Sequence, residues 1–136
     1  MARVITAEEV VAAAFDAMAG PFGWDGASDC SATACAAFET LTGLDLMRGL
    51  RGAYGTQAEA LALIRARGGF LALWSAQAAL CGLAAGAPET GAIGVIRTET
   101  MAGRALGLCV RPGLWAAKSP KGAALTPAIM ERCWNA

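Results

Sequence analysis

Histidine is missing from this chain of 136 residues. Histidine is the usual general base for a catalytic cysteine and a frequent metal ligand, so its absence argues against a Cys–His enzyme. The chain has five cysteines, Cys30, Cys35, Cys81, Cys109 and Cys133. No two of them have the C-x-x-C spacing of a zinc or redox site, and we therefore expect neither a metal nor a cofactor.

Charge is also scarce, because 16% of the residues are charged and 56% are hydrophobic. No basic run or basic patch with interspersed aromatics is present, which argues against nucleic-acid binding. The few charges are unevenly distributed: residues 1–60 carry eight acids and three bases, and residues 61–136 carry three acids and eight bases. This asymmetry fits either attraction between two halves of one fold or head-to-tail contacts between subunits.

The longest stretch without charge, residues 68–88, is nominally long enough to cross a bilayer. Several glycines, a serine and a glutamine interrupt it, so we expect a buried helix in a soluble fold and no membrane insertion. Glu8, Glu9 and Asp16 fall where a signal peptide would have its apolar segment. The sequence therefore predicts synthesis in the cytoplasm without a signal peptide.

Capping residues predict a helical half over residues 1–82. Thr6 with Glu9 and Thr56 with Glu59 have the spacing of capping boxes, and Asp29 is a favourable N-cap. These residues open three helices, each ended by glycine, and a fourth helix is expected around residues 71–80.

Short runs with β-branched residues follow in residues 90–136. We expect strands over residues 92–97, 104–110 and 114–118, with a hairpin turn at residues 111–113. Helices followed by strands predict an α+β fold, in which N-terminal helices pack on a small antiparallel sheet. The length fits one domain over residues 1–136.

Two further groups of residues allow more than one interpretation. The tryptophans are expected in the core or at a subunit interface, with a glycan-binding groove as the alternative: Trp24, Trp74, Trp115 and Trp134. Four arginines are expected to face solvent or another subunit, with binding of an anionic polymer as the alternative: Arg48, Arg51, Arg65 and Arg67.

A set of motifs in a fixed order suggests a family. They are the aromatic turn Phe22-Gly23-Trp24, Asp29-Cys30-Ser31 at a helix start, Leu41-Thr42-Gly43, Tyr54, a strand beginning with glycine and a hairpin. In this order they resemble the NlpC-type, papain-like cell-wall peptidases, in particular the compact forms found in tail modules of phages and gene-transfer agents. The resemblance covers nearly the whole chain.

The resemblance implies that Cys30 occupies the position of the catalytic nucleophile. A cysteine in the first turn of a helix lies near the positive end of the helix dipole, which favours the thiolate. The family places the histidine base on the first strand of the hairpin, where this chain has Ala105, and a second histidine on the next strand, where it has Ala116. The usual Gly-Asp pair is Gly91-Ala92 here.

These replacements indicate a catalytically inactive peptidase fold that is kept as a structural part of a phage-like tail tip or baseplate. Its expected partners are other tail or baseplate proteins, and its expected location is the virion tail. Two alternatives remain. One is an active peptidoglycan hydrolase in which Asp25, Glu89 or Glu99 replaces the histidine base. The other is a module that binds peptidoglycan without cleaving it.

Overall fold

The computed structural model describes residues 4–98 and 103–136. In chain order the elements are α1 (Ala7–Ala17), α2 (Cys30–Thr42), α3 (Gln57–Ala66), α4 (Phe70–Leu80), β1 (Ile93–Thr98), β2 (Gly103–Arg111), β3 (Leu114–Lys118), β4 (Ala123–Pro127) and β5 (Ile129–Trp134). Helices precede strands and the sheet is antiparallel, which confirms the predicted α+β class.

The helices begin at the predicted capping residues. The Thr6 side chain accepts a hydrogen bond from the Glu9 backbone N–H at the start of α1, and the Thr56 side chain does the same for Glu59 at the start of α3. Helix α4 has no side-chain cap and follows Gly69, whose φ of 114° lies in the region that glycine tolerates. Within the described residues, no helix has the length and apolar character needed to span a membrane.

The sheet has the strand order β4-β3-β2-β1-β5, so four strands form a meander and β5 returns beside β1. Strands β4 and β5 were not predicted, because neither alternates strictly between apolar and polar residues and β4 ends in Pro127. They occupy opposite edges of the sheet, about 19 Å apart if it were flat, yet only Ala128 connects them. The sheet must therefore curl until its two edges approach each other.

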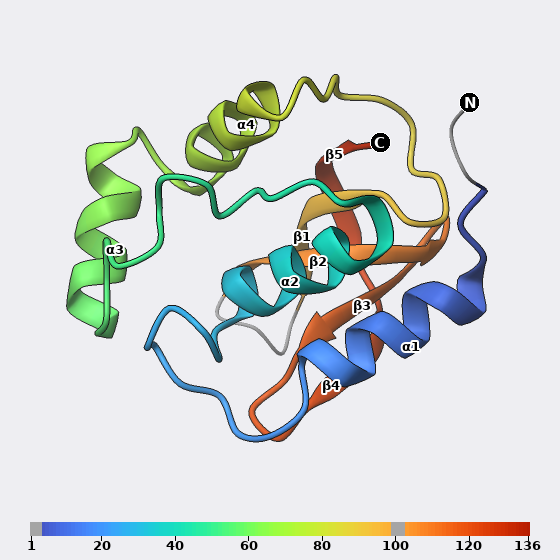
Figure 1. Cartoon of the computed structure of the whole chain (residues 1–136), viewed down its shortest axis with the longest axis horizontal. Coiled ribbons are helices and arrows are strands. Elements are labelled where there is room, and N and C mark those ends of the chain that lie inside the picture. The colour runs from blue at the N-terminus through green and yellow to red at the C-terminus, as the bar shows by residue number, and fades with distance from the viewer. Residues whose placement is uncertain (1–3, 99–102) are drawn as a thin grey trace.

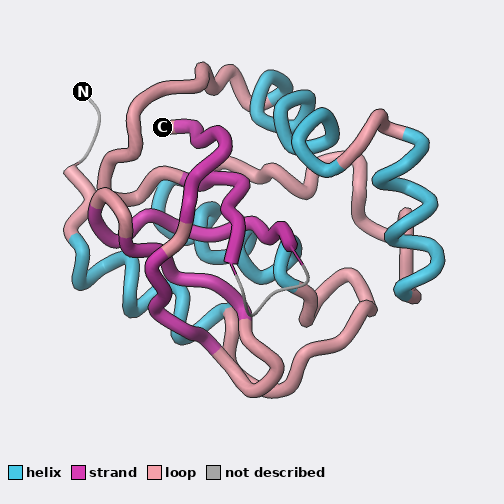
Figure 2. The backbone as a smooth tube through the Cα atoms, turned by 180° about the vertical axis from the view of Figure 1, so that it is seen from behind, coloured by secondary structure: helices cyan, strands magenta, loops and turns pink. Residues whose placement is uncertain are grey.

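Helices α1 and α2 pack side by side and cover one face of this curled sheet, mainly over β2 and β3 (Figure 1). The main core between them includes Val10 of α1, Phe38 of α2, and Leu106 and Leu108 of β2. Seen from behind, the strands lie in front of these two helices, and α3 and α4 stand to one side of them (Figure 2). This arrangement leaves the first turn of α2 close to the ends of the central strands.

The opposite, inner face of the sheet encloses a second group of buried side chains, here called the inner cluster. Its members are Cys30, Ala92, Ile96, Ala105, Cys109, Trp115, Ala117 and Cys133. Gly94 leaves room for it, since a Cβ at this position would lie 2.9 Å from both Trp115 Cη2 and Cys133 Cβ. The curl of the sheet thus builds a small core of its own, with Trp115 as its largest side chain.

Lys118, at the end of β3, is fully buried, and this burial was not predicted. Its Nζ donates hydrogen bonds to the carbonyl oxygens of Met18, at 2.8 Å, and Gly20. These carbonyls lie at the C-terminal end of α1, whose last turn has no basic residue of its own. The ammonium group therefore satisfies free carbonyls and the negative end of the helix dipole, and it fixes the start of the connection to α2.

Candidate functional site

The candidate site is built around the first turn of α2, which Asp29 caps. Asp29 Oδ1 accepts hydrogen bonds from the backbone N–H groups of Ser31, at 3.0 Å, and Ala32, at 2.9 Å. Its Oδ2 accepts a bond of 2.9 Å from the hydroxyl of Tyr54. The cap ties the helix start to the segment before α3 and so fixes the position of Cys30, the next residue.

The aromatic turn before α2 is held by its own polar contacts. Asp25 accepts hydrogen bonds from the backbone N–H groups of Ala27 and Ser28, at 2.9 and 2.7 Å. The rings of Phe22 and Trp24 meet edge to face with centroids 5.1 Å apart. These contacts keep Trp24 at the edge of the site.

Cys30 is buried, with 8% of its surface exposed, and belongs to the inner cluster. Burial raises the pKa of the thiol. A hydrogen bond with the neighbouring Ser31 hydroxyl, with Sγ and Oγ 3.9 Å apart, lowers the pKa, and the Asp29 charge raises it further. The helix start alone would favour a thiolate, but burial outweighs it, and the thiol stays protonated at neutral pH.

The positions that the resemblance assigns to the catalytic partners separate into two groups. Ala105 and Ala92 lie in the inner cluster with Cys30, so the structure brings these three residues to the same side of the sheet. Ala116 lies in the main core under the helices, on the other face. Its neighbour Ala117 shares the inner face with Ala105, and it too has no polar group.

Of the three carboxylates proposed as substitute bases, the structure describes Asp25 and Glu89, and neither is suited to serve Cys30. Asp25 is exposed, and hydrogen bonds from the backbone of Ala27 and Ser28 lower its pKa, which makes it a weaker base. Glu89 borders a cavity with Leu41 and Thr42, at the end of α2 opposite Cys30 and about 18 Å away along the helix. Glu99 lies outside the described residues.

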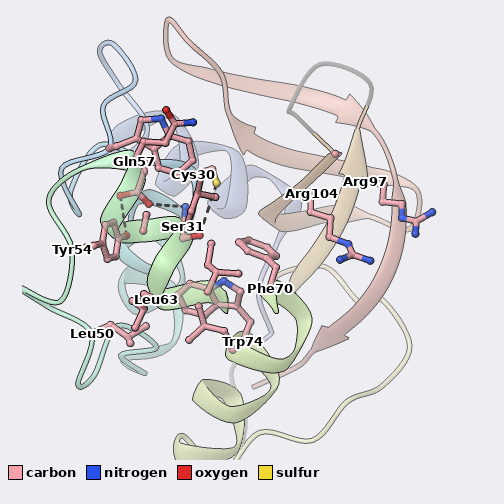
Figure 3. Close-up of a pocket in the computed structure, with 17 residues that line it drawn as sticks. Cys30, Ser31, Leu50, Tyr54, Gln57, Leu63, Phe70, Trp74, Arg97 and Arg104 are labelled. Atoms are coloured by element: carbon pink, nitrogen blue, oxygen red, sulfur yellow. Dashed lines mark hydrogen bonds between the residues drawn. The ribbon is translucent and has the colours of Figure 1, made fainter. Parts of the chain in front are cut away.

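A cleft of about 680 Å³ opens beside Cys30, and we call it the Cys30 cleft. Most of its wall is apolar and comes from α3 and α4, through Ala60, Leu61, Leu63, Ile64, Phe70, Leu73 and Trp74. Figure 3 shows Tyr54 and Leu50 on one side of Cys30 and Ser31, and Arg97 and Arg104 at the far end beyond Phe70. The walls of this cleft could not be predicted from the sequence, because they come from segments far apart in the chain.

Two polar features of the cleft wall stand out. Trp74 is 2% exposed, and its indole N–H has no acceptor among the described residues. An unpaired buried donor of this kind costs about 1–3 kcal/mol. At the far end, Arg97 Nε and Arg104 Nε lie 3.2 and 2.8 Å from the Glu131 carboxylate. Two guanidinium groups thus share one carboxylate, and this trio keeps one net positive charge.

The buried thiol leads to a prediction about alkylation. At neutral pH, iodoacetamide is expected to modify Cys81 at least about tenfold faster than Cys30, because Cys81 is only half-buried and Cys30 is buried, while the pKa of both thiols is raised. Peptide mass spectrometry after timed quenching measures both rates, and a Cys81→Ser variant checks the assignment. Preferential labelling of Cys30 would contradict the protonated thiol.

The same thiols predict a loss of stability at alkaline pH. Burial raises the pKa of Cys109 from 9.0 to about 11 and raises the pKa of Cys30 and Cys35 as well. Between these values the unfolded chain loses its thiol protons before the folded chain does, so stability falls as pH rises from about 9 to about 11. Burial lowers the pKa of Lys118, which has the opposite effect on stability.

Urea unfolding at a series of pH values tests this prediction. A Cys109→Ala variant should lose less stability than the original chain over the same alkaline range. If the free energy of unfolding falls equally steeply with pH in the two proteins, Cys109 does not contribute to the alkaline loss of stability.

The fold and the site define an α+β protein with a buried thiol, an apolar cleft and no placed base among the described residues. The chain belongs to the family described as Domain of unknown function (DUF6950), whose model matches residues 2–136. No curated protein and no solved structure gives a significant match to the chain.

Proposed function

We propose that this protein is a catalytically inactive relative of the NlpC-type peptidases that serves as a structural component of a phage-like tail tip or baseplate. Its partners would be other tail or baseplate proteins, and its place would be the virion tail after synthesis in the host cytoplasm. The tail context comes from the resemblance in motif order. The environment of Cys30 supports the absence of catalysis.

The environment of Cys30 is the observation that carries the proposal. The inner cluster packs apolar side chains and other cysteines against the thiol, the Ser31 hydroxyl is its described side-chain hydrogen-bond partner, and Ala105 stands where the resemblance requires the base. A general base typically contributes about 10²–10⁴-fold to the rate, and it also generates the thiolate. Among the described residues, no group is placed to deprotonate the thiol for attack on a peptide carbonyl or to protonate the leaving amine.

The packing around Cys30 supports a retained structural role for the same residues. The Asp29 cap, the Tyr54 hydroxyl and the inner cluster hold the helix start against the strands independently of any catalysis. A fold that keeps this scaffold and has buried alanines at positions 92, 105 and 116 fits a structural role that needs no catalysis.

Conservative replacement of the thiol separates the structural role from the enzymatic one. Particles that carry Cys30→Ser are expected to assemble and infect normally, and the purified original protein is expected not to degrade peptidoglycan. If the purified protein degrades peptidoglycan and Cys30→Ser abolishes that activity, the inactive assignment fails. If the chain is missing from purified particles, the tail assignment fails even when no hydrolysis is found.

The open cleft beside Cys30 favours a second candidate, a module that grips peptidoglycan without cleaving it. The cleft remains accessible, with Trp24 and Gln57 at its edge. Retention of the purified chain on isolated cell walls, reduced by a Leu61→Asp change inside the cleft, would support this candidate. Failure of the original chain to be retained would dismiss it.

A further inference from the structure

The Cys30 cleft has the composition of a ligand site along most of its length. Helices α3 and α4 contribute an apolar wall, and Leu61 on this wall is 46% exposed to solvent. Exposed leucine beside half-buried Leu63, Ile64 and Phe70 leaves a continuous apolar surface in contact with water. A volume of about 680 Å³ lies within the range of pockets that bind small molecules. An apolar body placed there would remove this surface from water.

The far end of the cleft has the opposite character. Arg97 and Arg104 border it, and their side chains are 59% and 44% exposed. Glu131 pairs with both, yet its side chain is only 14% exposed, so the accessible face of this trio is formed by guanidinium groups. Guanidinium groups bind carboxylate and phosphate with directed, charge-assisted hydrogen bonds.

The remaining charged group that borders the cleft does not compete for a ligand. Asp29 is 2% exposed, and its two oxygens accept hydrogen bonds from the α2 backbone and from Tyr54. Among the described lining residues, the ionised groups that a ligand reaches are therefore the two arginines.

From this arrangement we propose that the Cys30 cleft binds an anionic amphiphile, a small molecule with an aliphatic or aromatic body and a carboxylate at one end. The body lies along α3 and α4, and the carboxylate binds Arg97 and Arg104. The site is noncovalent and leaves the Cys30 thiol unchanged. The proposal does not depend on the tail assignment, because it rests only on the walls and charges of the cleft.

Calorimetric titration with decanoate, decanol and decylammonium below their micelle concentrations tests the proposal on the whole chain. The three probes share one apolar chain and differ in the charge of the head group. Decanoate is expected to bind at least about tenfold more tightly than decylammonium, with decanol between them. Tryptophan fluorescence provides a second readout, since Trp24 and Trp74 line the cleft.

Two variants test the two ends of the cleft. Replacing the cationic trio together, by Arg97→Gln, Arg104→Gln and Glu131→Gln, avoids leaving Glu131 unpaired. This triple replacement is expected to weaken the binding of decanoate about tenfold and to leave the binding of decanol unchanged. Leu61→Asp is expected to weaken the binding of both decanoate and decanol at least about tenfold, because it places a carboxylate on the apolar wall.

Matched controls lie outside the cleft. Leu80 is 60% exposed at the end of α4 and does not line the cleft, and Leu80→Asp is expected to leave all three affinities unchanged. Circular dichroism confirms that each variant is folded. Failure of decanoate to bind would overturn the proposal, as would equal weakening by Leu80→Asp and Leu61→Asp. A preference for decanoate that survives replacement of the cationic trio would also overturn it. None of these outcomes bears on whether the chain is found in tail particles.

Discussion

Replacing Trp115 with alanine is expected to lower the free energy of unfolding by about 3–5 kcal/mol, the usual cost of truncating a buried tryptophan. Trp115 is 1% exposed and is the largest side chain of the inner cluster. Its ring lies directly over Gly94, where a Cβ would be only 2.9 Å from Cη2. The curled strands surround this ring, so they cannot close over the cavity without changing the curl itself.

Urea unfolding followed by circular dichroism measures this loss. Leu125→Ala is the matched control, because Leu125 lies on β4 with 44% of its surface exposed. That change should remain within about 0.5 kcal/mol of the original chain. A loss below about 1 kcal/mol for Trp115→Ala would mean that the inner cluster is not a true core.

Removing the carboxylate of Asp29 should produce the second large loss of stability. Asp29→Ala is expected to lower the free energy of unfolding by about 2–4 kcal/mol, which is the sum of a lost helix cap and an unsatisfied Tyr54 hydroxyl. The residue is 2% exposed, so water does not readily replace its contacts. The same change loosens the first turn of α2, and with it the position of Cys30.

A double-mutant cycle separates the contribution of the helix cap to this loss from that of the hydrogen bond between Tyr54 and Asp29. Tyr54→Phe alone should cost about 1 kcal/mol, and in the Asp29→Ala background it should cost less, because its partner is already gone. Asp29→Asn retains an amide oxygen for the backbone N–H groups and should fall between the original chain and Asp29→Ala. Independent, additive effects of Asp29→Ala and Tyr54→Phe would contradict the hydrogen bond between them.

The agreement between sequence and structure is best where the interactions are local. The capping box at Thr6 and the N-caps Thr56 and Asp29 satisfy backbone N–H groups within three residues, so the spacing of residues is enough to place the helices. At Thr56 only half of the predicted capping box forms, because Glu59 accepts a hydrogen bond from the Gly55 backbone N–H and not from that of Thr56. Gly43, with φ of 77°, ends α2 as expected. The first three strands and their hairpin turn are placed nearly as well.

The last two strands were missed for a reason that is also physical. The segment from Ala123 to Trp134 contains Pro127 and does not alternate, and its pairing is decided by distant partners. Strand β4 pairs with β3, while β5 crosses to the far edge and pairs with β1. Only the curl of the whole sheet makes both pairings compatible with a one-residue connection.

The candidate site was predictable in part. The sequence located Cys30 in the first turn of a helix, and the structure confirms this and places Ala105 in the same cluster. The face of Ala116 depends on the register between β2 and β3, which is irregular between Cys109 and Arg111, so spacing along the chain did not determine it. The Cys30 cleft and buried Lys118 arise from segments that meet only in the folded chain.

The missing histidine is a fact of composition, and by itself it determined that no Cys–His pair can form. Local spacing likewise determined the helix that begins at Cys30. Only the tertiary structure decided the state of that thiol and what surrounds it. Burial is a property of many distant residues packed together, and here it outweighs the helix dipole and leaves an apolar cleft beside a protonated cysteine.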